Sequence, residues 1–187
     1  MTEAEKQEAL ATLREREGLV VADCPEPDGW LRMVCILPES ERPLLQTLFR
    51  EQIFWCDLLV SVSGSHHPGP EERVRVHYHL ESLIRGWKFA VTMERSVIAG
   101  EKPVFPGFSD LWKAAEWHER ETAELFGVEF EGHPYPRRLL LPADWEGYPL
   151  RKDYQPADSY HGIKIRYARE DSMDEAPTGK QVQQPDK

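Results

Sequence analysis

The sequence RVRVHYHLESL, residues 73–83, alternates clearly between polar and apolar side chains. A β-strand places successive side chains on opposite faces of its sheet, so this period predicts one apolar and one polar face. The apolar face would carry Val74, Val76, Tyr78 and Leu80, and the polar face Arg73, Arg75, His77, His79 and Glu81. This is the pattern of a sheet that is covered on one face only.

Four other segments have the composition and flanking turn signals of strands. They are residues 19–22, 30–37, 54–63 and 87–95. Phe89, Val91 and Met93 fall on one face of the last of these strands. Loops rich in proline or glycine are expected at residues 24–29, 64–70 and 100–107.

Helices are expected before and between these strands. Thr2 and Glu5 have capping-box spacing, which predicts a helix over residues 2–17. Ser40 is expected to cap a second helix that ends near Glu51. Its apolar residues recur at helical spacing and are predicted to face the core: Leu44, Leu45, Leu48 and Phe49.

The order of these elements is helix, two strands, helix and three strands. It predicts an α+β fold: a two-layer domain over residues 1–108, with a mixed or antiparallel sheet and helices on one face. We expect Ser109 to cap a further helix, which continues or restarts through Glu119 to Phe126. This helix and an irregular docking segment would make up residues 109–154. Residues 155–187 are expected to form an extended tail whose end is mobile, because it has few core formers.

Composition limits the classes of partner. The chain has 187 residues and a formal net charge of −10, which argues against binding to nucleic acid or directly to anionic lipid. No apolar run of about 18 residues is present, so no membrane insertion is expected. The N-terminal sequence MTEAEKQEAL lacks the apolar region of a secretory signal, which predicts a cytoplasmic chain.

The cysteines and histidines offer weak metal-site patterns. Cys24, Cys35 and Cys56 are widely spaced and form no CxxC pair, so we interpret them as buried reduced thiols in strands. His77 and His79 share one strand face at a spacing that could hold a metal ion, but a polar sheet surface explains them better. The adjacent histidines at positions 66 and 67 are expected to be exposed in a loop.

The segment from Val128 to Tyr154 contains four prolines, so it can form neither an ordinary helix nor a long strand. It is also too apolar for a solvated linker. We therefore predict that it packs over its own domain or docks on another protein. The acidic residues before it come with no nucleophile or phosphate-binding loop, so structural ion pairing, either within the domain or across an interface, is the preferred interpretation.

The pattern ERExxELFGVxFxGHP at residues 119–134 is followed by RRL at 137–139 and LRKDY at 150–154. Together these motifs resemble the signature of the 30-kDa subunit of respiratory complex I, which in bacteria is the C subunit of NADH-quinone oxidoreductase. Tyr135 departs from it, because the resemblance predicts an acidic residue there. The positions that the resemblance marks as an interface are Glu119, Arg120, Glu121, Glu124, Phe126, Gly127, Gly132, His133, Pro134, Arg137, Arg138, Leu139, Arg151, Lys152, Asp153 and Tyr154.

The resemblance implies the same α+β architecture and a cofactor-free structural or assembly subunit, without catalytic, cofactor-binding or metal-binding residues of its own. It would brace the connecting module in the peripheral arm of a proton-pumping translocase of the respiratory chain. The whole complex would carry FMN and Fe–S clusters and pass electrons from NADH to a membrane quinone. The implied partners are the D (49-kDa-like), B and I subunits of the same hetero-oligomer. The implied location is peripheral, on the cytoplasmic face of the bacterial inner membrane.

Two other functions stay open at this point. One is the equivalent subunit of a related membrane-bound NiFe-hydrogenase or of a ferredoxin- or F420-linked complex, because those complexes reuse the same module. The other is a stand-alone metal hydrolase that uses His118 and Glu119. These two residues match the first half of the zinc motif HExxH, but Thr122 occupies the position of its second histidine.

Overall fold

The computed structural model of the protein describes residues 3–15, 19–21, 29–35, 37–157 and 159–164. The chain divides into two compact units, residues 1–154 and residues 155–187. The helices of the first unit are α1 (Glu3–Arg14), α2 (Pro38–Arg50) and α3 (Ala115–Phe126). Its strands are β1 (Leu19–Val21), β2 (Leu31–Cys35), β3 (Leu58–His67), β4 (Arg73–Ser82), β5 (Trp87–Ser96), β6 (Val104–Pro106) and β7 (Glu129–Glu131).

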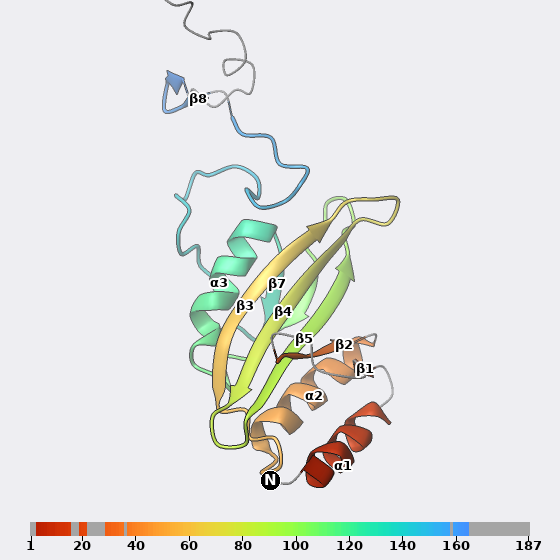
Figure 1. The fold of residues 1–187 in the computed structure, drawn as a ribbon. Coiled ribbons are helices and arrows are strands. Elements are labelled where there is room, and N and C mark those ends of the chain that lie inside the picture. Colours follow the sequence, from red (N-terminus) through yellow and green to blue (C-terminus); the bar gives the residue numbers. More distant parts are fainter. Residues whose placement is uncertain (1–2, 16–18, 22–28, 36, 158, 165–187) are drawn as a thin grey trace, which may run out of the picture. The chain divides into compact units, whose positions relative to one another are not determined.

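Five strands of the first unit form one mixed sheet in the order β1-β2-β5-β4-β3 (Figure 1). Strand β2 runs parallel to β5, and the other neighbours are antiparallel. A parallel pair needs a long connection, which here contains α2 and the β3–β4 hairpin. From α1 to β5 the elements follow the predicted order, so the α+β fold with a mixed sheet is confirmed.

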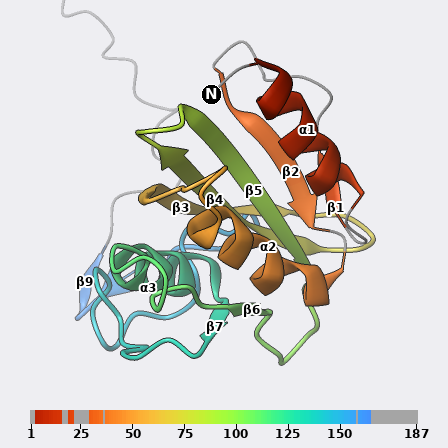
Figure 2. The same cartoon turned by 90° about the horizontal axis from the view of Figure 1, so that it is seen from below.

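The three helices cover the apolar face of the sheet. The predicted apolar residues of β4 are all fully buried: Val74, Val76, Tyr78 and Leu80. Trp87 and Arg95 of β5 stand opposite Ser82 and Val74 and therefore share this face. Lys6 of α1 lies over the Trp87 ring, Arg95 binds α2, and Tyr78 binds α3. The helices lie in sequence order across the sheet, from α1 beside β1 to α3 beside β3 (Figures 1 and 2).

Strand β3 differs from the prediction. It begins at Leu58 rather than at residue 54, and it continues through residues 64–67, which were expected to begin a loop. A Cβ atom on Gly64 would lie 2.4 Å from Cδ2 of Phe126, so glycine at this position of the strand lets α3 pack closely against it. His66, expected to be exposed, is only 5% exposed because it lies on the buried face of the strand.

Helix α2 begins two residues before the predicted cap. Leu37 is the N-cap, and Pro38 can follow it because the first N–H groups of a helix have no intrahelical partner. Ser40 lies inside the first turn, where its Oγ donates a hydrogen bond to Leu37 O at 2.7 Å. The predicted inward face is confirmed, since three of its leucines are buried and Phe49 packs against the core.

Helix α3 begins at Ala115, so the predicted cap at Ser109 is wrong. Residues 108–114 form turns instead, and tertiary hydrogen bonds hold them in place. The Phe108 N–H donates to a side chain of α3, and the indole N–H of Trp112 donates to Cys56 O. The helix ends as the sequence suggests, at Gly127 in the left-handed conformation.

Two short strands were not predicted. Strand β6 lies within the expected loop at residues 100–107, and it pairs in parallel with β7 inside the irregular segment. Each contributes one buried aromatic residue, Phe105 and Phe130, to the core. Three-residue strands contain too few residues to show a period of two, so pattern reasoning misses them.

The second unit contains a small hairpin where the sequence predicts an extended tail. Strand β8 (Ser159–Tyr160) pairs antiparallel with β9 (Ile163–Lys164). The turn between them uses positive φ angles at both of its residues, one of which is glycine. The expected mobile end of the tail lies outside the residues that the structure describes. The same holds for Thr2 and for residues 24–28 of the expected loop, which include Cys24.

The two described cysteines are free and buried. Cys35 lies in β2 as expected, whereas Cys56 lies in the loop before β3 rather than in a strand. Burial raises the pKa of each thiol to about 12, which keeps both protonated and unreactive. Within the described ranges, no helix has the length and apolar character needed to cross a membrane.

Candidate functional site

Helix α3 directs Glu119 into the protein interior. Its Oε1 accepts hydrogen bonds from Tyr78 Oη at 2.9 Å and from the Phe108 N–H at 2.7 Å. Its Oε2 is buried and has no hydrogen-bond partner within the described part of the chain. Burial raises the pKa of Glu119 to about 7, because the two hydrogen bonds only partly offset the loss of water.

Gly107 and His133 close the surroundings of this carboxyl group. A Cβ atom on Gly107 would lie 3.2 Å from Glu119 Oε2 and 2.9 Å from Glu131 O, so a side chain has no room there. His133 Nδ1 accepts the Tyr135 N–H, and its Nε2 donates to a main-chain carbonyl of α3 at 2.9 Å. That Nε2 is 4.0 Å from Glu119 Oε2, too far for a hydrogen bond.

Five residues further along the same helix, Glu124 binds the backbone of the irregular segment. Its two carboxylate oxygens accept the N–H groups of Leu139, Leu140 and Leu141 at 2.9, 2.6 and 3.2 Å. Three successive amides of a segment without regular secondary structure thus obtain a partner from one side chain. Glu124 is therefore the acceptor that fixes this part of the segment on α3.

Two arginines bind the carbonyl groups of the same segment. Arg120 on α3 donates through Nε and Nη2 to the main-chain oxygens of Arg137 and Arg138, both at 2.9 Å. The guanidinium of Arg138 in turn binds the carbonyls of Pro142, Ala143 and Trp145. Among the described residues, Glu124, Arg120 and Arg138 bind the backbone of this segment instead of an opposite charge, so for these three residues ion pairing across an interface stays a prediction.

Ion pairing does occur at the C-terminal end of the signature. Arg151 Nη2 lies 3.2 Å from Glu72 Oε1, and Arg151 Nε lies 3.7 Å from Asp153 Oδ1. His66 joins this network, because its Nε2 is 2.7 Å from Glu72 Oε1 while its Nδ1 accepts the Lys152 N–H at 2.9 Å. The network fastens residues 151–153 to the end of β3.

The same network contains a group of potential metal ligands in the described residues, namely His66, Glu72 and Asp153. Both ring nitrogens of His66 already have hydrogen-bond partners, and Arg151 adds a cation beside the carboxylates. A cation bound there would have to displace these contacts. The geometry therefore favours a structural role for the network.

Aromatic side chains complete the packing of the segment. The ring of Tyr148 covers Gly127, where a Cβ atom would lie 2.4 Å from the ring. Tyr154 stacks on Trp145 with ring centroids 6.5 Å apart. Phe126 packs against Gly64 of β3, whereas Gly132 and Pro134 lie in an exposed turn.

Part of the surface formed by residues 117–154, here called the signature surface, has no partner inside the described part of the chain. Among the described residues, the side chains of Glu121, Arg137 and Lys152 form no hydrogen bond or ion pair. Four large apolar side chains are also more than half exposed there: Trp117, Tyr135, Leu140 and Leu150. An acidic residue at position 135 would have stood two residues from Arg137, whose side chain is free in this chain.

One polar pair away from the signature was not predicted from the sequence. Arg95 makes two hydrogen bonds of 2.6 Å to the fully buried Glu41 of α2, and its Nε donates to Val104 O at 3.0 Å. This pair joins α2, β5 and β6. An arginine on the apolar face of β5, in line with Phe89 and Met93, was the signal that could have revealed a buried acidic partner.

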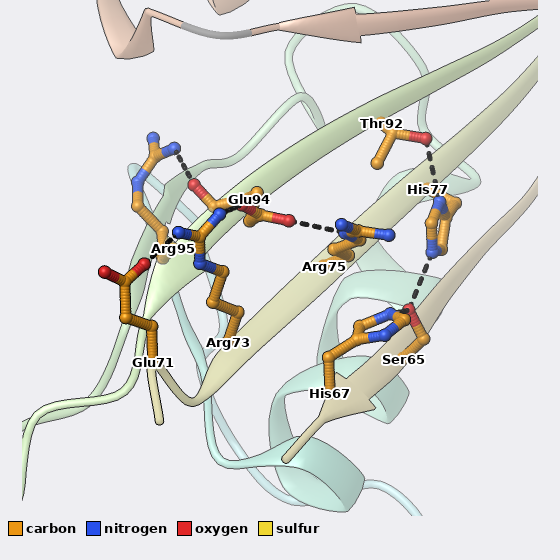
Figure 3. Close-up of polar contacts among 9 residues, drawn as sticks. All are labelled: Ser65, His67, Glu71, Arg73, Arg75, His77, Thr92, Glu94 and Arg95. Atoms are coloured by element: carbon orange, nitrogen blue, oxygen red, sulfur yellow. Dashed lines mark hydrogen bonds and ion pairs between the residues drawn. The ribbon is translucent and has the colours of Figure 1, made fainter. Parts of the chain in front are cut away.

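The polar face that was predicted for β4 carries a hydrogen-bond network on the open face of the sheet (Figure 3). The ring of His77 lies between Ser65 Oγ and Thr92 Oγ1, at 2.9 Å from each. Burial first, and neighbouring positive charges second, lower the pKa of His77 to about 4. Arg73 and Arg75 both bind Glu94. The network has the character of a polar sheet surface, since both nitrogens of His77 face hydroxyl groups.

Comparison with known proteins gives a consistent picture. Residues 34–160 match the family described as "Respiratory-chain NADH dehydrogenase, 30 Kd subunit". The C subunit of the NADH-quinone oxidoreductase of Chloroherpeton thalassium is 36% identical over 140 residues, which cover 75% of this chain and 52% of the relative. The C subunit of the Chlorobium phaeobacteroides enzyme is 43% identical over 110 residues, which cover 58% of this chain and 64% of the relative.

A third relative is the J subunit of the NAD(P)H-quinone oxidoreductase of Synechococcus sp. (strain WH7803), with 42% identity over 103 residues that cover 52% of this chain and 57% of the relative. The chain therefore spans between half and two thirds of the length of these curated relatives.

Among solved structures, a chain of the membrane-bound sulfane sulfur reductase, an archaeal respiratory membrane complex, has a similar fold. The TM-score is 0.62 at 20% identity, and the match covers 82% of this chain and 86% of that chain. The family match includes α2, the sheet from β2 onward, α3 and the whole signature segment. The chain thus belongs to the family of the 30-kDa subunit of the respiratory-chain NADH dehydrogenase.

Proposed function

We propose that the chain is a cofactor-free structural subunit in the peripheral arm of a proton-pumping NADH-quinone oxidoreductase. The observation that carries this proposal is how the signature segment is held. Glu124, Arg120 and Arg138 bind its backbone, so these groups fix the shape of the segment instead of serving a reaction. The fixed segment exposes Tyr135, Leu140 and Leu150, and α3 exposes Trp117, as a docking surface requires.

The partners follow from the family relationship. In this proposal the signature surface contacts the D, B and I subunits, which carry the electron-transfer chemistry of the connecting module. FMN, the Fe–S clusters, NADH and quinone belong to the complex and not to this chain. The assembled complex would hold the chain on the cytoplasmic face of the bacterial inner membrane, without insertion into the lipid.

A second candidate differs only in the electron donor of the complex. Two of the relatives are named for NADH and one is named for NAD(P)H, so the donor named for the complex differs among the relatives. The NiFe-hydrogenase and ferredoxin- or F420-linked relatives would differ in the donor module. In each case this chain would have the same bracing role.

The experiment that tests the proposal is affinity purification from the native membrane. The tagged chain is expected to co-purify with the D, B and I subunits and with an NADH-binding flavoprotein after gentle solubilisation. Recovery of a hydrogenase subunit or another donor module would select the second candidate. A chain that elutes alone, with hydrolase activity and bound zinc, would reject both.

Assembly and catalysis are separated by substitutions in the signature. Arg138→Ala removes the donor to three carbonyls of the segment, and Glu121→Ala removes an acidic side chain with no partner in this chain. In the proposed interface Glu121 pairs with a cation of a partner subunit; loss of one partner of a desolvated ion pair costs about 3–5 kcal/mol, and about 1.4 kcal/mol is tenfold in affinity. Arg138→Ala acts instead by releasing the backbone that shapes the docking surface. We expect far less complex on a native gel but near-normal NADH-quinone activity per complex.

The matched control for these substitutions is Glu8→Ala on α1, where the side chain is exposed. Its complex should be recovered at the wild-type level. Full assembly of the Arg138→Ala variant together with lost turnover would place chemistry in the segment and contradict the bracing role.

A further inference from the structure

A cavity of about 340 Å³ lies between α3, β7 and the signature segment. Its size falls at the low end of the range for ligand pockets, about 300–1,000 Å³. Its charged lining consists of Lys102, Arg120, Arg137 and Arg138 with Glu119, Glu124 and Glu129. Cations therefore outnumber acids at this cavity, although the whole chain carries a net charge of −10.

Most of these charged groups are already engaged. Glu124 accepts three backbone N–H groups, and the guanidinium groups of Arg120 and Arg138 bind backbone carbonyls. Within the described residues, Lys102 and Arg137 have no hydrogen-bond or ion-pair partner for their side chains. Glu129, also exposed, is a single acid beside these two cations.

One buried atom of the lining is also without a partner. Glu119 is fully buried, and its Oε2 has no hydrogen bond in the part of the chain that the structure describes. An unsatisfied buried oxygen costs about 1–3 kcal/mol, so a group that supplies or shares a proton there is stabilising. The cavity thus combines two unengaged cations at its surface with one unsatisfied carboxyl oxygen inside.

We propose that the mouth of this cavity receives a carboxylate side chain from a partner subunit, which Arg137 and Lys102 bind. Charge complementarity selects this occupant, because the two unengaged cations at the cavity face only one exposed acid, Glu129, so that a lysine or arginine of the partner would be repelled. The inference rests on the proposed function, since it requires a partner subunit.

Glu119 lies deeper in the cavity and does not oppose such a partner. Burial raises the pKa of Glu119 to about 7, so near neutral pH this carboxyl group can be protonated and then adds no negative charge to the site. The negative charge of the partner carboxylate is balanced by Arg137 and Lys102 at the cavity mouth.

The test uses cross-linking in the assembled complex. Arg137→Lys keeps the cation and adds a primary amine, which a carbodiimide joins to a nearby carboxylate as an amide. We expect mass spectrometry to identify a cross-link from position 137 or from Lys102 to an aspartate or glutamate of another subunit. Arg50→Lys, at an exposed cation of α2, is the control and should give no such inter-subunit link.

Assembly gives a second readout. Arg137→Glu should lower the amount of complex on a native gel about tenfold, whereas Arg137→Lys and the control Arg50→Glu should leave it unchanged. Wild-type recovery of the Arg137→Glu complex would overturn the inference. So would cross-links that stay within this chain, for example to Glu129.

Two further outcomes are distinguishable. If the complex stays intact but no inter-subunit cross-link forms, and the purified complex binds inorganic phosphate more weakly after Arg137→Glu, the cavity binds small anions and the proposed partner carboxylate is wrong. If the wild-type chain co-purifies with no other subunit, the proposed function itself fails, whatever the variants do.

Discussion

The five-stranded sheet and the signature segment of residues 128–154 are held in place by different interactions. The sheet is buried on one face by apolar side chains, among which Val76 and Leu80 are fully inaccessible. The segment instead exposes several of its large apolar side chains, and side-chain groups of α3 bind its backbone directly. Apolar burial therefore holds the layers of the fold together, whereas hydrogen bonds from side chains to the backbone hold the exposed signature segment.

The difference shows what each kind of interaction can specify. Apolar burial is non-directional and roughly proportional to area, so it selects which face of a strand or helix points inward. A segment with four prolines has no repeating ladder of hydrogen bonds, so its backbone groups need individual partners. Glu124 and Arg138 supply such partners, which leaves the apolar side chains free to face a neighbouring protein.

The largest expected effect is in the sheet. Val76→Asp places a carboxylate without a partner on the fully buried face, and the expected loss in the free energy of unfolding is about 4 kcal/mol or more. Ser63→Asp on the opposite, exposed side of the sheet should change it by less than about 0.5 kcal/mol. Urea unfolding measures both. Equal losses would show that the two faces are not distinguished by burial.

The next effect concerns Glu119, where the two regions meet. Its pKa is raised from 4.5 to about 7, so the folded chain holds a proton that the unfolded chain releases above about pH 4.5. The contribution of this proton to the free energy of unfolding is therefore fully present below about pH 4.5, and it is lost as the pH rises through about 7. The loss should be on the order of 3 kcal/mol, at about 1.36 kcal/mol per pKa unit.

Glu119→Gln isolates this contribution, because glutamine does not titrate. Urea unfolding gives the free energy of unfolding of the wild type and of the variant at pH 5 and at pH 8. The difference, wild type minus variant, should decrease between pH 5 and pH 8. A difference that stays constant between the two pH values would contradict the raised pKa.

A smaller effect is expected at the contact between α3 and β3. Gly64→Ala forces the Phe126 ring away from the strand, and overpacking of this kind costs typically about 1–3 kcal/mol. Gly69→Ala is the matched control, because a Cβ atom there meets nothing within 4 Å. Thermal unfolding should separate the two variants. If they unfold alike, the ring can move aside at no cost.

The smallest effect on global stability should come from the signature segment. Glu124→Ala leaves three amides without their acceptor, but these groups are only partly buried and water can replace part of the loss. We expect a loss of about 1–2 kcal/mol in the free energy of unfolding, together with much faster proteolysis within residues 137–145. Glu116→Ala, earlier on the same helix, should leave the cleavage rate unchanged, because only its carbonyl group is used.

The sequence predicted the elements whose patterns are long. The period of two in β4 correctly assigned Val76 to the core, and the spacing of leucines in α2 correctly gave its inward face. Gly127 was expected to end α3, and it does. In each of these cases one local preference repeats over several residues, so the pattern survives without knowledge of the neighbours.

The wrong predictions share a cause. Gly64 and His66 look like loop residues. The Phe126 ring, however, packs where a side chain at position 64 would lie, and His66 is bound inside the fold by Glu72 and by the Lys152 N–H. Ser109 has the chemistry of a cap, yet the neighbouring Phe108 amide is taken by a carboxylate of α3. Contacts between residues far apart in the sequence decided these positions.

The sequence by itself determined the layers, the family signature and the irregular character of residues 128–154, because composition and periodicity are local properties. Only the tertiary structure decided how the charges of the signature are used. Glu119 and Glu124 lie on one helix, yet the first faces a buried tyrosine and the second a row of backbone amides. A side chain's partner depends on what the rest of the chain brings within hydrogen-bond distance, and sequence spacing does not contain that distance.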